Sequence, residues 1–347
     1  MKHSSPESLG KIKRSFSVTA PGVLEAGRSA PRGWLAEAVF ERARRRIAAG
    51  RPPALAAYAV LRERAEAAWK APIESLRDRD GSPHFRQDGV YVPNRDGVVN
   101  AQANRRAGEL AGRFSRHSLD LALAYRIDGD ERYLCRALDW IHAWCINENT
   151  LMFPDGYVLD SATPGLPYGG NIVLFHGFCD AFLAIALLRR HPAWELAAQA
   201  TVLRWVRKMV EPQRRRMFFE GREMTNNWED ARLLYLGFAA CALDDLDLLL
   251  EVFERWRRII PLKMTDTGEL PRETMRTRSM TYTLAALHST TLVAELAAGW
   301  GIPLYDYSVN GRCLRLALDF AARHLMNIKT WPFPMLDSDS ESWGGGA

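Results

Sequence analysis

Apolar residues recur at helical spacing along most of this chain. Between residues 34 and 325 they fall at the i, i+3, i+4 and i+7 positions that share one face of an α-helix. Alternating runs joined by Asn-Gly or Asp-Gly, which indicate β-hairpins, are nearly absent. The pattern predicts an all-α chain with about ten helices, over Trp34–Ala48, Leu55–Trp69, Leu110–Ile127, Tyr133–Ile146, Ile172–Leu188, Trp194–Val210, Trp228–Leu243, Leu246–Ile260, Met280–Ala298 and Cys313–Leu325.

Short breaks divide the predicted helices into pairs. A glycine and two prolines at 50–53 separate the first two helices, Asp128–Asp130 separates the third from the fourth, and His191–Pro192 the fifth from the sixth. Helix pairs joined by short turns predict an (α/α) toroid, an incomplete α/α barrel of about five to six helix pairs. An ordinary bundle or an α-solenoid would give the same periodicity, although no repeat motif is visible.

The helical pattern also predicts the domain organisation. Residues 1–30 are polar and spotted with glycine and proline, which is typical of a flexible tail. We expect one helical domain over 31–335 and a second tail over 336–347. Two long segments, 72–103 and 147–170, break the helical rhythm, and loops of this length in a compact domain are often functional. Over an α/α toroid they would rim the cleft.

The charge balance is mildly basic. Of 347 residues, 46 are basic and 41 acidic, for a net charge of +5. This excess is too small to indicate a nucleic-acid partner, but it could steer a polyanion to the surface. Most basic residues are arginines, whose planar guanidinium pairs well with carboxylates. The codon bias of a GC-rich genome would explain the arginine content equally well.

The sequence contains no motif typical of membrane-spanning, zinc-binding or disulfide-stabilised proteins. No run approaches ~18 apolar residues, so no membrane span is expected. Residues 1–22 include basic residues but no apolar run of signal-peptide length, which leaves a cytoplasmic location open. The histidines form no zinc motif and no phosphate-binding loop is present, so no metal or cofactor is expected. The five cysteines form no Cys-x-x-Cys pair and are expected to be buried free thiols.

Two stretches near the starts of predicted helices carry candidate chemistry. Asn226 and Asn227 stand directly before the helix that starts at Trp228. Asparagine is a good N-cap, but one cap needs only one asparagine. We therefore expect one of them to cap the helix and the other to face a ligand.

The second stretch places two arginines ahead of a tyrosine. Arg278 and Tyr282 are four residues apart and would share a helix face, whereas Arg276 meets Tyr282 only if the helix starts after Arg276. A solvated helix start with Tyr282 in the core is the alternative interpretation. Arginine and asparagine can neutralise a sugar carboxylate and tyrosine can move a proton, which are the tasks in a polysaccharide lyase.

Other ionisable residues have simpler interpretations. His176 and His288 lie in apolar helical patterns, where a lone histidine is usually a core group. Inverting glycosidases need two opposed carboxylates. The candidates for such a pair are Asp155, Asp160, Glu229 and Asp230.

Five motifs in order resemble those of the alginate lyase family of polysaccharide lyases, over a span from about Tyr91 to Pro334. The family implies an (α/α) toroid that cleaves an acidic polysaccharide by β-elimination without an obligatory cofactor. The motifs are Tyr91–Asn100 (YVPNRDGVVN), Arg132–Pro154, Asn226–Trp228, Leu270–Tyr282 (Pro-x-Glu-x-x-Arg-Thr-x-x-x-x-Tyr) and Tyr305–Pro332.

The resemblance implies catalytic roles for a few residues. Asn227, or alternatively Asn226, and Arg276 would neutralise the carboxylate, and Tyr282 would donate a proton. The better-known alginate lyases have a histidine directly after the asparagine, where this chain has a tryptophan. The base is therefore either Tyr282 itself or His176 from another helix. The residues expected to bind the polymer are Trp228, Arg278, Arg95, Tyr91 and Tyr168.

Three functions remain open at this point. The first is a lyase acting on alginate, polymannuronate or glucuronan, which Tyr282 with Arg276 favours. The second is a glycoside hydrolase on a similar toroid, and the third is a non-catalytic relative that binds polysaccharide in exopolysaccharide production. The expected partner is an acidic polysaccharide, bound by a monomer or weak oligomer. The resemblance implies a periplasmic or secreted protein.

Overall fold

The computed structural model of this protein describes residues 35–75, 106–152, 176–219 and 224–336, all within one compact unit, Pro31–Ala347. All ten predicted helices are present in these ranges, together with a short additional one, α11. The α-helices are α2 (Glu37–Ala48), α3 (Pro52–Lys70), α4 (Arg106–Asp128), α5 (Glu131–Cys145), α7 (Cys179–Leu188), α8 (Leu196–Phe219), α9 (Asn227–Leu243), α10 (Leu246–Lys263), α11 (Pro271–Thr274), α12 (Ser279–Ala298) and α13 (Leu314–Leu325).

The remaining elements are short. The 3₁₀ helices that lie wholly within the described ranges are η3 (His176–Phe178), η4 (Leu304–Asp306) and η5 (Ile328–Thr330). The strands described are β1 (Ser308–Val309) and β2 (Arg312–Cys313), which pair antiparallel. Their turn is Asn310–Gly311, and both residues have positive φ, as a two-residue hairpin requires. The proposed division into a tail, a domain and a second tail stays a prediction.

Helix α8 extends beyond its predicted end at Val210. The predicted boundary lay just before Pro212, because proline usually ends or kinks a helix. The helix instead continues to Phe219 with Pro212 inside it. Packing explains the difference, since Gln213 and Met217 in the added turns are buried. Gln213 also accepts a hydrogen bond from Arg232 of α9.

Helices α4, α7 and α9 are successive neighbours and run in the same direction. Near the starts of α4 and α7, Gly177 faces Ala111. At the other end, Tyr125 in the last turn of α4 hydrogen bonds to the ring of His191, which lies just past the end of α7. At the end of α7, Arg189 donates to the carbonyl of Ala242 in the last turn of α9. The N-terminal ends of these three helices therefore lie at one end of the fold.

Helix α12 continues this series beside α9. Asp230 in the first turn of α9 accepts from Thr290, and Gly237 one layer further along faces Leu296. Residue numbers rise together along both helices, so α12 is parallel to α9. Four parallel inner helices thus stand in the order α4, α7, α9 and α12.

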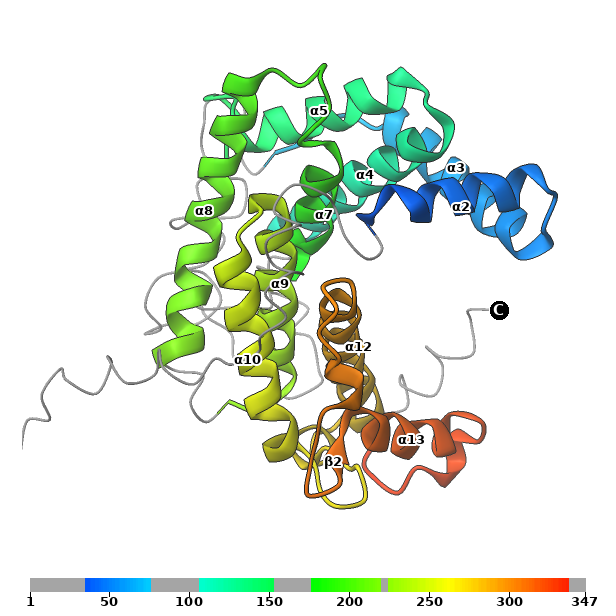
Figure 1. The fold of residues 1–347 in the computed structure, drawn as a ribbon, viewed down its shortest axis with the longest axis vertical. Coiled ribbons are helices and arrows are strands. Elements are labelled where there is room, and N and C mark those ends of the chain that lie inside the picture. Colours follow the sequence, from blue (N-terminus) through cyan, green and yellow to red (C-terminus); the bar gives the residue numbers. More distant parts are fainter. Residues whose placement is uncertain (1–34, 76–105, 153–175, 220–223, 337–347) are drawn as a thin grey trace, which may run out of the picture. The chain divides into compact units, whose positions relative to one another are not determined.

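The helices between them run in the opposite direction. Met209 and Gln213 of α8 pair with Tyr235 and Arg232 of α9, so residue numbers fall on one helix as they rise on the other. Helix α10 is antiparallel to α9 in the same way, and Figure 1 shows α8 and α10 alongside α9. Parallel inner helices alternating with antiparallel outer ones form the predicted (α/α) toroid, which is confirmed.

Much of the tryptophan content serves the core. Trp140, Trp144 and Trp256 are fully buried, and the Trp144 ring stacks on Phe114 with centroids 4.6 Å apart. The Trp256 indole N–H donates to the Thr290 carbonyl of α12 over 3.0 Å, which joins an outer helix to an inner one. Each such ring contributes roughly 1.5–3 kcal/mol by burial. These tryptophans therefore position the inner helices.

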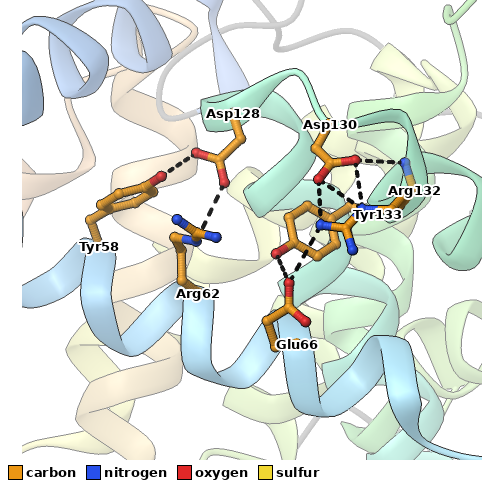
Figure 2. A network of polar contacts seen from close by, with 7 residues as sticks. All are labelled: Tyr58, Arg62, Glu66, Asp128, Asp130, Arg132 and Tyr133. Carbon is orange, nitrogen blue, oxygen red and sulfur yellow. Dashed lines mark hydrogen bonds and ion pairs between the residues drawn. The ribbon is translucent and has the colours of Figure 1, made fainter.

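A polar network fastens outer helix α3 to the turn between α4 and α5, as Figure 2 shows. Tyr58 donates to Asp128 over 2.6 Å, and Tyr133 donates to Glu66 over 2.6 Å. Asp130 caps α5 by accepting from the backbone N–H of Arg132. The full set is Tyr58, Arg62, Glu66, Asp128, Asp130, Arg132 and Tyr133. Because much of it is exposed, it orients α3 more than it stabilises the fold.

The cysteines only partly follow their prediction. All five are free thiols, and Cys145 and Cys179 are buried as expected. Cys135 is exposed and Cys241 and Cys313 are only half-buried, which corrects the expectation of five buried thiols. Cys135 lies on α5 beside Leu134, which faces the core, so the apolar pattern of this helix leaves Cys135 on the outer face.

Gly268 offers a test of how the turn before α11 is held. Its φ is +89°, and a Cβ at this position would lie 2.7 Å from the carbonyl carbon of Leu316 in α13. We expect Gly268→Ala to lower the free energy of unfolding by about 3 kcal/mol, because strain and steric overlap act together.

Chemical denaturation of the matched variant Gly129→Ala provides the control. Gly129 also has a positive φ, of +70°, but nothing lies within 4 Å of the place that an alanine Cβ would occupy. Gly129→Ala should lower the free energy of unfolding by about 1 kcal/mol, because backbone strain acts alone. Equal losses in the two variants would contradict the close approach of α13.

Candidate active site

The parallel inner helices bring three predicted groups to one end of the toroid. His176 begins η3 directly before α7, Asn226 and Asn227 begin α9, and Tyr282 lies in the first turn of α12. η3 contacts both α4 and α9. These residues are far apart in sequence, and only the common direction of the helices places them at the same end.

Arg276 folds back over Tyr282. Helix α12 begins at Ser279, after Arg276, which is the condition under which the two side chains can meet. The guanidinium carbon of Arg276 lies 3.9 Å from the centroid of the Tyr282 ring. A cation over an aromatic face at this distance is attracted by the ring quadrupole. Tyr282 is half-buried, so the alternative of a tyrosine inside the core is wrong.

The C-terminal segment clamps the start of α12. The Ser279 hydroxyl donates to the carbonyl of Pro334 over 2.6 Å and accepts from the Trp331 indole over 2.7 Å. Thr277 accepts from the backbone N–H of Leu336, and Arg278 forms an antiparallel bridge with Met335. The turn that carries Arg276, Arg278 and Tyr282 is therefore held by residues some fifty positions away.

Neither asparagine caps α9 with its side chain. Asn226 occupies the N-cap position but its side chain makes no capping bond, and Asn227 is the first helical residue. The expectation that one of them caps the helix is wrong. Both Oδ1 atoms are buried without a hydrogen-bond partner among the described residues. A buried unsatisfied polar atom costs about 1–3 kcal/mol, which a bound ligand or water would recover.

Glu273 links the two halves of the site. Its Oε1 accepts from the backbone N–H of Asn227 over 2.7 Å, and the residue is completely buried. Burial raises the pKa of the Glu273 carboxyl to about 7, although the Asn227 N–H opposes this shift. Sequence reasoning gave it no role. Its place in the Pro-x-Glu-x-x-Arg motif was the available signal.

His176 offers a buried ring nitrogen. Its Nε2 has no hydrogen-bond partner among the described residues. Burial and the nearby His288 lower the pKa of His176, so the ring is neutral at pH 7 and can accept a proton. His288 itself is exposed, which corrects its interpretation as a core histidine.

Of the residues expected to bind the polymer, two lie within the described ranges. Trp228 is half-buried and packs against the hydrophobic core, and Arg278 is half-buried at the start of α12. Tyr91, Arg95 and Tyr168 lie outside the described residues. Their predicted contacts with the polymer stay predictions.

Two of the four carboxylates considered for a hydrolase are committed to internal ion pairs. Glu229 is fully buried between Arg232 and Arg255. Asp230 is paired with Lys263 of α10 and accepts from Thr290. Neither carboxylate can face a second carboxylate across a cleft. Asp155 and Asp160 lie outside the described residues.

Comparison with known proteins identifies the family. The family model for alginate lyase matches residues 47–331. A solved alginate lyase from Bacteroides ovatus is 21% identical, with a TM-score of 0.73 over 88% of this chain and 86% of that one. Alginate lyase A1-III from Sphingomonas species A1 is 18% identical, with a TM-score of 0.54 over 80% and 79%. A histidine-to-alanine variant of A1-III, complexed with a tetrasaccharide, is 19% identical with a TM-score of 0.59 over 80% of each chain.

The chain belongs to the alginate lyase family. It is therefore a polysaccharide lyase, and the family implies an acidic polysaccharide as substrate. A comparison with curated proteins gives no match. Over the described ranges, no helix is long and apolar enough to cross a bilayer, and no group of three potential metal ligands is found.

Lys263 tests the buried ion pair under the site. Replacing Lys263 by alanine leaves the buried Asp230 carboxylate without its cation, so we expect the free energy of unfolding to fall by about 3–5 kcal/mol. Arg258→Ala on the same helix is the control, because it removes only an exposed pair with Glu254 and should cost under about 1 kcal/mol. Similar losses in urea denaturation would refute a stabilising role for the buried pair.

Proposed function

We propose that this polysaccharide lyase cleaves a uronic-acid-containing chain, alginate or polymannuronate or glucuronan, by β-elimination. Such a reaction removes the proton on C5 beside the sugar carboxylate and breaks the bond from C4 to the glycosidic oxygen. The C5 proton is weakly acidic while the carboxylate keeps its charge. Donors or cations must therefore stabilise the charge that develops on the carboxylate.

The position of Arg276 over Tyr282 is the observation that carries the proposal. It places a cation 3.9 Å from the ring of the proposed proton donor. The start of α9 adds Asn226 and Asn227, whose side-chain amides carry N–H groups that can donate to a carboxylate. The backbone N–H of Asn227 also joins this helix start to the same turn through Glu273. The N-terminal ends of α9 and α12 also carry the positive ends of their helix dipoles, which favour an anionic ligand.

Tyr282 is proposed as the group that protonates the leaving oxygen. In β-D-mannuronate and β-D-glucuronate the C5 proton and the C4 oxygen lie on the same face of the sugar. A single tyrosine, ionised and then reprotonated, can serve as base and acid. His176 is the second candidate for the base, supported by its buried Nε2 and its neutral form at pH 7.

The two sugars differ at C2, away from the reacting bond, so the same residues can act on either. Trp228, where the better-known relatives have a histidine, is consistent with a base from elsewhere in the site. Membership of the alginate lyase family supports a location in the periplasm or outside the cell. Two of the four candidate carboxylates of a hydrolase, Glu229 and Asp230, are already paired with cations, which disfavours a hydrolase.

Replacing Tyr282 by phenylalanine tests the mechanism. The ring under Arg276 is kept and one hydroxyl is lost, so we expect activity to disappear while the melting temperature changes little. The purified enzyme is assayed on polymannuronate, polyguluronate and glucuronan by the ultraviolet absorbance of the new C4–C5 double bond. Tyr58→Phe, which loses a hydroxyl that donates to Asp128 on α4, should stay active.

Full activity of Tyr282→Phe would eliminate the tyrosine mechanism. New reducing ends without ultraviolet absorbance would show a hydrolase instead. Cleavage by the unmodified chain, lost only in Tyr282→Phe, is the expected pattern.

Arg276 tests the neutralisation of the carboxylate. We expect Arg276→Ala to lower kcat/KM by an amount equal to about 2–4 kcal/mol, on the scale of removing one donor from a developing anion. Arg272→Ala changes the net charge equally but removes an exposed arginine of α11, so it serves as the control. A fall in kcat/KM of under about threefold for Arg276→Ala would count against this role.

A further inference from the structure

Glu273 is a completely buried carboxylate at the junction of the two halves of the site. Its Oε1 accepts from the backbone N–H of Asn227 over 2.7 Å. Its Oε2 is also buried and has no hydrogen-bond partner among the described residues. Helix α11, which carries Glu273, ends two residues before Arg276. The side chain therefore contacts the start of α9 from the segment that leads to the arginine–tyrosine pair.

Charged groups on α9, on α10 and in the turn after α11 act on Glu273. Asp230 of α9 repels a negative charge on Glu273, while Lys263 of α10 and Arg276 of the following turn attract it. Lys263 is already bonded to Asp230 and Thr290. Tyr282 is the titratable group at the start of α12. Neutral and ionised Glu273 are therefore nearly balanced, and a new charge nearby can decide between them.

We propose that Glu273 is a positioning residue that takes up a proton from solvent on Oε2 when a uronate carboxylate binds, so that affinity for the polymer falls as pH rises. The inference rests on the proposed function, in which Arg276 and the asparagines hold that carboxylate. Once Arg276 pairs with the substrate, it attracts the Glu273 carboxylate less. A second anion in the same low-dielectric region also repels an ionised Glu273.

The protonation of Glu273 determines the direction in which affinity changes with pH. The pKa of Glu273 is raised to about 7 chiefly by burial, so the residue is mostly protonated at pH 6 and mostly ionised at pH 8.5. Substrate binds best to the protonated form, which carries no opposing charge. For a group that titrates at about 7 and must be protonated, the limit of the effect on KM between these pH values is roughly thirtyfold.

The test compares KM and kcat at pH 6.0 and 8.5 for the unmodified enzyme and Glu273→Gln. Glutamine keeps an oxygen that accepts from the Asn227 N–H but cannot titrate. We expect KM of the unmodified enzyme to rise between about three- and thirtyfold over this range, and KM of Glu273→Gln to change less than about twofold. The pH dependence of kcat should be the same in the unmodified enzyme and in Glu273→Gln. A purely structural role of Glu273 would not change the pH dependence of KM alone.

Glu269→Gln is the matched control. Glu269 lies in the same turn, where its carboxylate accepts from Thr274 over 2.6 Å, but it is only half-buried. This variant should keep the KM dependence of the unmodified enzyme. Equal KM ratios in the unmodified enzyme and Glu273→Gln, with cleavage still occurring, overturn the inference alone. Absence of cleavage of every uronate polymer overturns the proposed function as well.

A second measurement needs no change at Glu273. A tetrasaccharide of the best-cleaved polymer is bound to Tyr282→Phe at pH 7, and the heat is measured in phosphate and in Tris buffer. The difference reports protons taken up, and we expect more than about 0.3 per site. No uptake would overturn the inference even if Glu273→Gln fails to fold.

Discussion

The candidate site depends on the common direction of the four inner helices. Because α4, α7, α9 and α12 are parallel, their N-terminal ends meet at one end of the toroid. Each start carries the positive end of a helix dipole. In the proposed function, an anionic polymer would bind at this end, where these dipoles favour negative charge.

The first turn of α9 carries two buried acidic residues that help to position the site. Glu229 and Asp230 are acidic residues in the first turn, which the dipole favours, yet both are buried and paired with cations from α9 and α10. Buried ion pairs add little net stability compared with apolar packing. Their geometry does fix how α9 begins relative to α10 and α12, which sets the positions of Asn226 and Asn227.

The start of α12 is held in a different way, by hydrogen bonds to the C-terminal segment. Ser279 bonds to Pro334 and Trp331, and the chain at Thr277 bonds to Leu336. Glu273 then couples this turn to α9 through its hydrogen bond to Asn227. The two halves of the site are thus each held by their own contacts, and one titratable carboxylate joins them.

Hydrophobic periodicity alone determined the helical class, and ten helices could be predicted because each buries one face along a continuous stretch. Motif order pointed to the family and to Arg276 and Tyr282. The sequence could not show that Asn226 occupies the cap position without capping, that α8 continues through Pro212, or that Glu229 and Asp230 pair internally. Those outcomes depend on contacts between residues far apart in the chain, such as Asn227 with Glu273. Local spacing carries no information about such partners, so only the tertiary structure decided them.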